Sequence, residues 1–194
     1  RSHTVAAEGG AAGVVQAHDS LEHHFHDTVA GGDWLCEQDV VDYFVAHCTE
    51  EMTQLEHWGC VFSRNPDGRL DQRPFGAAGS PRTVYAADIT GHVLIQVLYE
   101  QLQKRMAEGM VVYEEFFAFR LVIDGGRCTG VISWDLMNGG VKLLTGKSVI
   151  LATGGVGRVF RATTNAYACT GDGMSMALRA GLPLKDMEFM QFHP

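Results

Sequence analysis

A histidine near the amino end stands in a setting that favours close contact with a cofactor. The run that contains it reads Arg1-Ser2-His3-Thr4-Val5-Ala6-Ala7-Glu8-Gly9-Gly10. Small residues and glycines leave backbone N–H groups uncovered, so a ligand can approach them closely. A neutral imidazole is in addition a nucleophile. The run therefore predicts a site for a flat cofactor that carries phosphate.

Two glycine turns later in the chain stand where α/β proteins bind ligands. Residues 148–152 read as a buried strand, and Thr153-Gly154-Gly155 follows it directly. Ligands of open α/β sheets bind at the carboxyl ends of the strands. The second turn, residues 170–173, precedes a helical stretch and contains Asp172. Each turn also has a plainer interpretation, which is a simple strand exit for the first and a helix N-cap for Asp172.

These motifs together resemble the flavoprotein subunits of the fumarate reductase and succinate dehydrogenase family, over essentially the whole chain. The resemblance implies that His3 carries covalently bound FAD, which would fix the flavin ring and tune its electronics. The plainer alternative is a histidine that only forms local hydrogen bonds. The other residues that the resemblance assigns to FAD are Ser2, Thr4, Val5, Ala6, Ala7, Glu8, Gly9, Gly10, Phe116, Phe117, Ala118, Thr153, Gly154, Gly155 and Asp172. For the residues at 116–118, ordinary core packing is the alternative for the side chains.

The same resemblance assigns two residues to a dicarboxylate substrate, fumarate or succinate. His193 matches the family histidine that binds a substrate carboxylate and is the catalytic residue expected in this chain. A protonated histidine donates two charge-assisted hydrogen bonds, which suits a dianion. Phe75 matches an aromatic residue that packs against the substrate, although a lone phenylalanine is more often part of a core. The family's proton-donating arginine would lie beyond Pro194.

The dinucleotide-binding fingerprint G-x-G-x-x-G is absent from these residues. In the family it precedes the run around His3, so we expect this chain to be a fragment without the first strand–helix unit. The predicted fold is α/β: a partial two-dinucleotide-type FAD-binding Rossmann-like domain with an inserted antiparallel β region. Residues 1–188 are expected to belong to this domain, and residues 189–194 to begin the capping domain that binds substrate.

The spacing of apolar residues predicts the elements that carry these motifs. Spacings of three and four indicate helices over residues 37–58 and 90–108, with Thr90 as N-cap of the second, and a shorter helix from about residue 173. Residues 1–33 are expected to be mainly extended chain and loop, and residues 60–75 a hairpin or two short extended segments. The segments predicted as strands are 110–113, 116–123, 129–136, 141–144 and 148–152. The last is continuously apolar, as in a parallel sheet covered on both faces.

Composition excludes several classes of function. The net charge of -8 argues against a nucleic-acid surface, and no apolar run is long enough to cross a bilayer. Five cysteines without a C-x-x-C pair favour neither a disulfide framework nor a tetrahedral metal site. The group His18, His23, His24 and His26 suggests metal binding, but a polar surface segment is favoured because no fourth ligand is placed beside it.

The resemblance thus implies a fumarate reductase flavoprotein subunit that reduces fumarate by hydride transfer from reduced FAD. The resemblance implies an iron–sulfur subunit and quinone-binding membrane anchors as partners, at the cytoplasmic face of a bacterial membrane. The motifs at residues 7–10 and 24–28 favour this branch over succinate dehydrogenase, which runs the reverse reaction. A non-catalytic flavin-binding or metal-binding module is the remaining alternative, and His3 argues against L-aspartate oxidase. The fragment alone is expected to be inactive.

Overall fold

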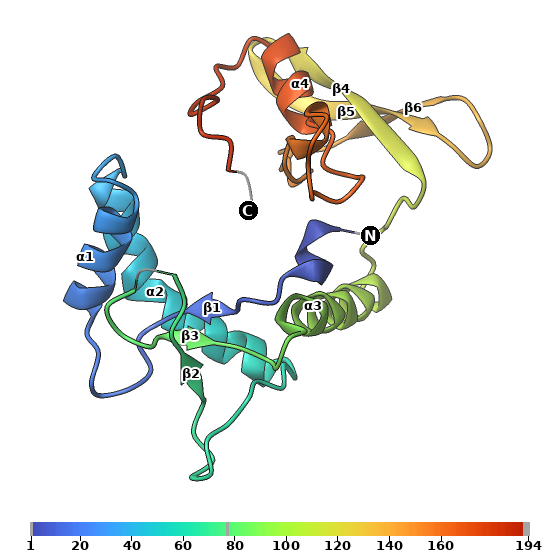
Figure 1. Ribbon diagram of the computed structural model, residues 1–194. Coiled ribbons are helices and arrows are strands. Elements are labelled where there is room, and N and C mark those ends of the chain that lie inside the picture. The colour runs from blue at the N-terminus through green and yellow to red at the C-terminus, as the bar shows by residue number, and fades with distance from the viewer. Residues whose placement is uncertain (1, 77, 192–194) are drawn as a thin grey trace. The chain divides into compact units, whose positions relative to one another are not determined.

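The computed structural model describes residues 2–76 and 78–191 and consists of two compact units (Figure 1). One unit is the continuous stretch Thr4–Gly109, and the other combines residues 1–3 with residues 110–194. A short 3-10 helix, η1 (His3–Ala6), runs across the boundary between them. No helix among the residues described is long and apolar enough to cross a membrane.

The unit Thr4–Gly109 is mainly helical and contains one small sheet. Its elements are β1 (Ala11–Ala12), α1 (Leu21–Gly31), α2 (Gln38–His57), β2 (Gln72–Arg73), β3 (Thr83–Val84) and α3 (Thr90–Ala107). The sheet has the order β1-β3-β2, and both pairings are antiparallel. Because β3 pairs with strands on both sides, it links the amino-terminal run to the segment that follows α2.

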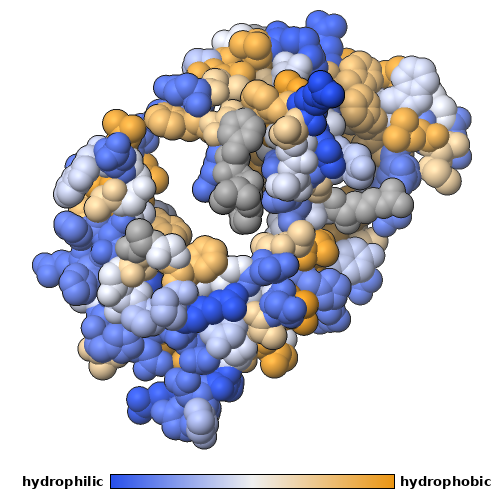
Figure 2. Space-filling model, in the orientation of Figure 1, coloured by the Kyte–Doolittle hydropathy of each residue, from blue (hydrophilic) through white to orange (hydrophobic). Residues whose placement is uncertain are grey.

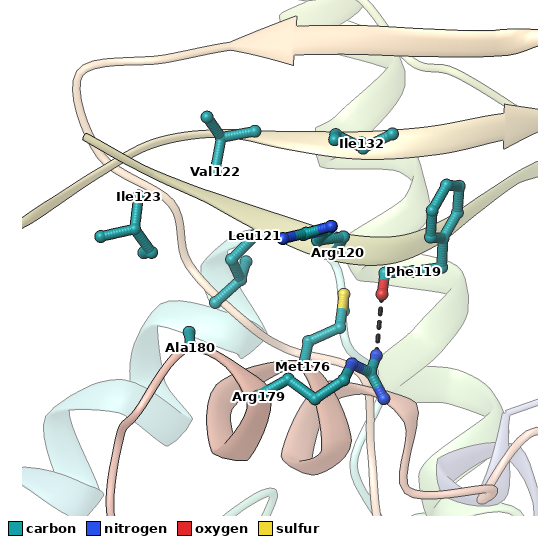
Figure 3. Close-up of a pocket in the computed structure, with 9 residues that line it drawn as sticks. All are labelled: Phe119, Arg120, Leu121, Val122, Ile123, Ile132, Met176, Arg179 and Ala180. Atoms are coloured by element: carbon teal, nitrogen blue, oxygen red, sulfur yellow. Dashed lines mark hydrogen bonds between the residues drawn. The ribbon is translucent and has the colours of Figure 1, made fainter.

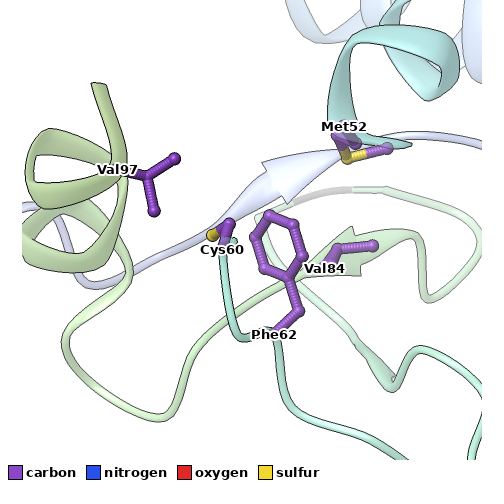
Figure 4. Packing of buried hydrophobic residues seen from close by; sticks show 5 residues of the cluster. All are labelled: Met52, Cys60, Phe62, Val84 and Val97. Carbon is purple, nitrogen blue, oxygen red and sulfur yellow. The ribbon is translucent and has the colours of Figure 1, made fainter. Parts of the chain in front are cut away.

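The apolar core of this unit is built from the helices and the central strand. Met52, Cys60, Phe62, Val84 and Val97 form one buried cluster, contributed by α2, the chain after it, β3 and α3 (Figure 4). The side chain of Val84 is completely buried. Burial of such side chains removes apolar surface from water, which is the main favourable contribution to folding. The core therefore holds α2, α3 and β3 in fixed positions.

The two long predicted helices are confirmed as α2 and α3, and the turn at residues 65–68 is confirmed as well. There the Gly68 N–H donates to the Asn65 carbonyl at 2.9 Å, and Arg64 pairs with Leu70 in an isolated antiparallel bridge. Gly109 ends α3 with a φ of 108°, a left-handed conformation that glycine adopts without strain.

The prediction that residues 1–33 are mainly extended chain and loop is wrong for residues 21–31, which form α1. Ser20 caps the helix by accepting a hydrogen bond from the His23 N–H at 3.1 Å. Val29 is completely buried, and it packs with Val41 and Val45 of α2. Polar residues dilute the apolar spacing of α1, so the Ser20 cap was the stronger signal for this helix.

The first residue of α3 has a different role from the one predicted. The N-cap is Ile89, which makes no side-chain cap hydrogen bond, and Thr90 is already helical. The Thr90 hydroxyl accepts from the Ala86 N–H at 3.0 Å and donates to the Glu8 carbonyl at 3.3 Å. Thr90 thus fastens the start of α3 to the amino-terminal run, instead of capping the helix.

The other unit is built on an antiparallel three-stranded sheet. Its strands are β4 (Phe116–Asp124), β5 (Arg127–Asp135) and β6 (Val141–Thr145), in that order across the sheet. Glycine pairs at 125–126 and 139–140, all four with positive φ, form the two connections, as the sequence predicted. The helix α4 (Asp172–Arg179) packs on β4 through buried Met176, and η2 (Gly157–Val159) precedes it.

The predicted buried strand at 148–152 is not formed, nor is the strand at 110–113. Ile150 is 89% exposed, where full burial was expected. A strand exists only when a neighbouring strand satisfies its backbone groups, and no described strand lies beside residues 148–152. Both sheets in the described residues are antiparallel. Hydrophobic residues also lie at the surface of the unit that contains β4–β6 (Figure 2).

Candidate functional site

The imidazole of His3 is exposed and is held by a hydrogen bond from a distant part of its own unit. Its Nδ1 accepts the N–H of Ala166 at 3.3 Å. A ring nitrogen that accepts cannot carry a proton, so the neutral ring has its hydrogen on Nε2. This hydrogen bond orients the ring. The Nε2–H has no acceptor among the described residues, and Nε2 becomes a nucleophile once it loses this proton.

The run after His3 belongs to the other unit, where the first turn of α3 holds it. The Gly91 N–H donates to the Ala7 carbonyl at 2.7 Å. A Cβ at position 91 would lie 1.8 Å from the Thr4 carbonyl oxygen, so only glycine fits there. The close approach of backbone to backbone fixes the conformation of residues 4–7.

Phe75 lies against Gly9 of the same run. A Cβ on Gly9 would lie 2.8 Å from the Phe75 ring, and 60% of Phe75 is exposed. The interpretation of Phe75 as a core residue is therefore wrong. A hollow of about 330 Å³ opens beside the ring. The residues that line it are Glu8, Gly9, Arg73, Pro74, Phe75 and Asp88.

The two predicted glycine turns meet in the unit that contains α4. The Gly171 N–H donates to the Gly155 carbonyl at 3.2 Å, and Gly154 and Gly171 both have a φ of 76°. No atom lies within 4 Å of a Cβ built on Gly154, so this turn is open to a ligand. The alternative of an N-cap role for Asp172 is wrong, because Gly171 is the cap. The carboxylate of Asp172 instead accepts a hydrogen bond from the Thr170 hydroxyl.

Contact between these turns depends on the absence of a side chain at position 173. Gly173 is buried, and a Cβ there would lie 2.0 Å from the Thr153 hydroxyl oxygen and 3.1 Å from its Cβ. We expect Gly173→Val to lower the free energy of unfolding by about 3 kcal/mol, since overpacking forces neighbouring atoms apart. Urea denaturation measures this change. The control Gly31→Val, at a position with open space around it, is expected to change stability much less.

Residues 116–118 lie at the start of β4, the strand on which α4 packs. Phe116 is half-buried and contacts the ring of Tyr113, with ring centroids 5.1 Å apart. Phe117 is 45% exposed, so its side chain is not part of the core. The core alternative thus describes Phe116 better than Phe117.

Another hollow, in the unit with β4–β6, is lined by none of the predicted site residues. It measures about 910 Å³ and lies between β4 and α4, where Leu121 and Met176 contribute apolar surface (Figure 3). Arg179 borders it and donates to the Phe119 carbonyl at 2.8 Å (Figure 3). Sequence reasoning missed this hollow, because alternating apolar residues on a strand indicate only that one face is covered.

The histidines at 18–26 do not form one group. His18, His23 and His26 are exposed, whereas His24 is buried, so the surface interpretation is wrong for His24. Burial, with Arg82 nearby, holds the pKa of His24 below its ordinary value. Across residues 2–76 and 78–191, no group of three or more potential ligands could hold a metal ion. His193 lies outside the described residues.

Several residues that hold the site were not found from the sequence. Arg73 donates to the carbonyls of Glu8 and Gly9, and Ala166 donates to His3. These partners are between 64 and 163 residues apart in the chain. No local motif marks either one, so only the folded arrangement shows them.

Comparisons with known proteins show which family the chain belongs to. The model for the FAD binding domain family matches residues 1–194. The fumarate reductase flavoprotein subunit of Escherichia coli is 52% identical over the whole chain, which spans 32% of that subunit. The succinate dehydrogenase flavoprotein subunit of Rickettsia conorii is 44% identical, and the chain spans 34% of it.

A solved structure agrees with the sequence comparisons. A mutant of E. coli quinol fumarate reductase is 54% identical, with a TM-score of 0.94 over 100% of this chain and 33% of that chain. The chain therefore spans about a third of the length of the relatives it matches. These matches show that the chain belongs to the FAD binding domain family and is similar to fumarate reductase flavoprotein subunits.

Proposed function

We propose that this chain is the part of a fumarate reductase flavoprotein subunit that binds FAD covalently through His3. The observation that carries the proposal is the state of the imidazole, which is exposed and has only Nδ1 engaged, by Ala166. A bond to the flavin at Nε2 would form as that nitrogen gives up its proton, and it would leave the lone pair on Nδ1, so the hydrogen bond from Ala166 remains possible after attachment. The ring then keeps one orientation before and after the bond forms.

The residues assigned to FAD fit a large, polar, phosphate-bearing cofactor. In the amino-terminal run, the backbone N–H groups of Glu8 and Gly9 have no acceptor among the described residues. In the unit with α4, the turn at Gly154 is open to a ligand. Asp172 is half-buried at the first turn of α4, where its carboxylate can accept from a cofactor hydroxyl group. These features support FAD contacts at residues 2–10, 116–118, 153–155 and 172.

The proposed reaction is reduction of fumarate to succinate, for which bound FAD, once reduced by electrons from quinol, would supply the hydride. His193 is proposed to bind one substrate carboxylate, and Phe75 to pack against the substrate. The exposure of Phe75 beside the hollow at Gly9 supports this role. Residues 189–194 are proposed to begin the capping domain. The arginine that delivers the proton would belong to the longer protein.

The proposed partners are an iron–sulfur subunit and quinone-binding anchor subunits, at the cytoplasmic face of a bacterial membrane. Their support is the match to quinol fumarate reductase. Identity of 52% to the fumarate reductase subunit, against 44% to the succinate dehydrogenase subunit, favours fumarate as the physiological substrate. Succinate oxidation is the same reaction in reverse and stays the second candidate.

The test uses the full-length flavoprotein in its assembled complex. We expect one flavin for each polypeptide, which stays with the chain as a fluorescent band after acid treatment and denaturing electrophoresis. The complex is expected to oxidise a reduced quinol analogue when fumarate is added. A purified complex with stoichiometric metal in this chain and no flavin would contradict the proposal and favour a metal-binding module.

A further inference from the structure

The amino-terminal run is held from one side by an arginine that the proposed function does not use. Arg73 lies on β2 and donates from Nε and Nη2 to the Gly9 carbonyl, at 3.2 and 2.8 Å. Its Nη2 donates in addition to the Glu8 carbonyl. One planar guanidinium thus binds two consecutive carbonyl groups of the run, a geometry for which its fork of donors is suited.

Arg73 is itself fixed by its neighbours. Its guanidinium carbon lies 4.3 Å from the centre of the Tyr85 ring, in a cation–π contact. The Tyr85 hydroxyl donates to the carboxylate of Asp71, and this hydrogen bond raises the pKa of Tyr85. The backbone of Arg73 pairs with Thr83 of β3. Arg73 is therefore a fixed support for the run.

The carbonyl groups of residues 7–9 all have donors from the protein. Gly91 binds the first, Thr90 and Arg73 bind the second, and Arg73 binds the third. The N–H groups of Glu8 and Gly9, by contrast, have no acceptor among the described residues. A peptide plane that is fixed through its carbonyl also has a fixed direction for the N–H of the next residue.

We propose that Arg73 is a positioning residue that fixes the peptide planes of Glu8 and Gly9, so that the backbone N–H groups of this run are pre-oriented for polar atoms of FAD. This inference rests on the proposed function. Arg73 acts through the backbone and transfers no proton or electron. Since binding groups that are fixed in advance lose less freedom when the ligand binds, their orientation determines how fast and how well FAD is bound.

The test follows uptake of FAD by the full-length flavoprotein, produced under flavin limitation and then supplied with FAD. Arg73→Met is expected to slow covalent incorporation by about tenfold. It should in addition shift the visible absorption maximum of the flavin that does bind, a signal that loss of stability alone does not move. Arg73→Lys keeps the charge but loses the planar fork, so it is expected to show the same two changes.

The matched control is Arg64→Met, because Arg64 lies on the same segment before β2. It donates to the Gly68 carbonyl at 2.7 Å and forms an ion pair with Glu56, and the structure gives it no contact with the run. We expect Arg64→Met to incorporate FAD at the wild-type rate with an unchanged spectrum.

The outcomes separate this inference from the proposed function. If the wild-type protein incorporates no flavin, the proposed function fails and the role of Arg73 fails with it. If the wild type incorporates flavin while Arg73→Lys matches it in rate and spectrum, the positioning role alone is overturned. Arg73→Lys decides the question even if Arg73→Met does not fold.

Discussion

Replacing His3 by serine in the full-length flavoprotein is expected to abolish covalent attachment of flavin. A serine hydroxyl is a weak nucleophile without a neighbouring base, and it has no ring nitrogen that Ala166 can orient. Acid treatment and denaturing electrophoresis should give a fluorescent band for the wild type and none for His3→Ser. FAD that is bound without a covalent bond should still be released from the native variant and be measurable in solution.

The control for this experiment is His18→Ser, because His18 is exposed and the resemblance gives it no flavin contact. This variant should keep the fluorescent band at wild-type intensity. A fluorescent band that persists in His3→Ser would show that flavin is attached at another residue. The open turn at Gly154 and the contacts of Asp172 would then still describe an FAD site, but one without attachment at His3.

Replacing Arg82 by methionine is expected to cost about 3–5 kcal/mol of stability, since it leaves buried carboxylates without their partner. The Arg82 side chain is 2% exposed and donates to Asp19 at 2.8 Å and to Asp27 at 2.7 Å. The side chain of Asp19 is only 1% exposed. Urea denaturation of the flavoprotein subunit, followed by circular dichroism, measures the loss.

Arg69→Met is the matched control for Arg82→Met. Arg69 pairs with Asp67, but the two side chains are 75% and 58% exposed, so solvent screens the pair. Such pairs contribute about 0–1 kcal/mol. A similar loss of stability in both variants would show that burial does not strengthen the ion pairs that Arg82 forms with Asp19 and Asp27.

The ion pair between Arg82 and Asp19 also makes the stability of the protein depend on pH. The hydrogen bond from Arg82 holds the pKa of Asp19 below its ordinary value of 3.8, despite the opposing effect of burial. A carboxyl whose pKa is lowered by folding stabilises the protein above its ordinary pKa, and this contribution is lost as pH falls through the folded pKa. The urea midpoint of the wild type is therefore expected to lose the Asp19 contribution only below about pH 3.8. In Arg82→Met the main cause of the lowered pKa is gone, so the urea midpoint should fall less over this pH range than it does in the wild type.

Sequence patterns predicted elements well where one chain segment determines them. The apolar spacing that defines α2 and α3 is local, as are the glycine pairs that join β4 to β5 and β5 to β6. The strand expected at 148–152 depends on neighbouring strands, and the described residues provide none. α1 was missed because its residues are mainly polar, although Ser20 caps it well.

Some residues of the candidate site lie in local motifs, and others are brought to it only by the fold. The glycine turns and the run around His3 are contiguous motifs, so their residue types could be identified directly. Arg73 and Ala166 reach the run and His3 from far along the chain, and their partners are backbone groups or a single ring nitrogen. Every residue has a backbone carbonyl, so no residue type marks the one that accepts a hydrogen bond. Only the folded structure shows such contacts.

At Gly91, the contact between α3 and the amino-terminal run joins backbone directly to backbone. Gly91 N–H is bonded to the Ala7 carbonyl, and the space at its α-carbon is filled by Thr4. A shift of the helix along its axis by a fraction of an ångström must therefore carry these peptide groups with it. The start of this 18-residue helix and the residues that follow His3 therefore cannot shift independently of each other.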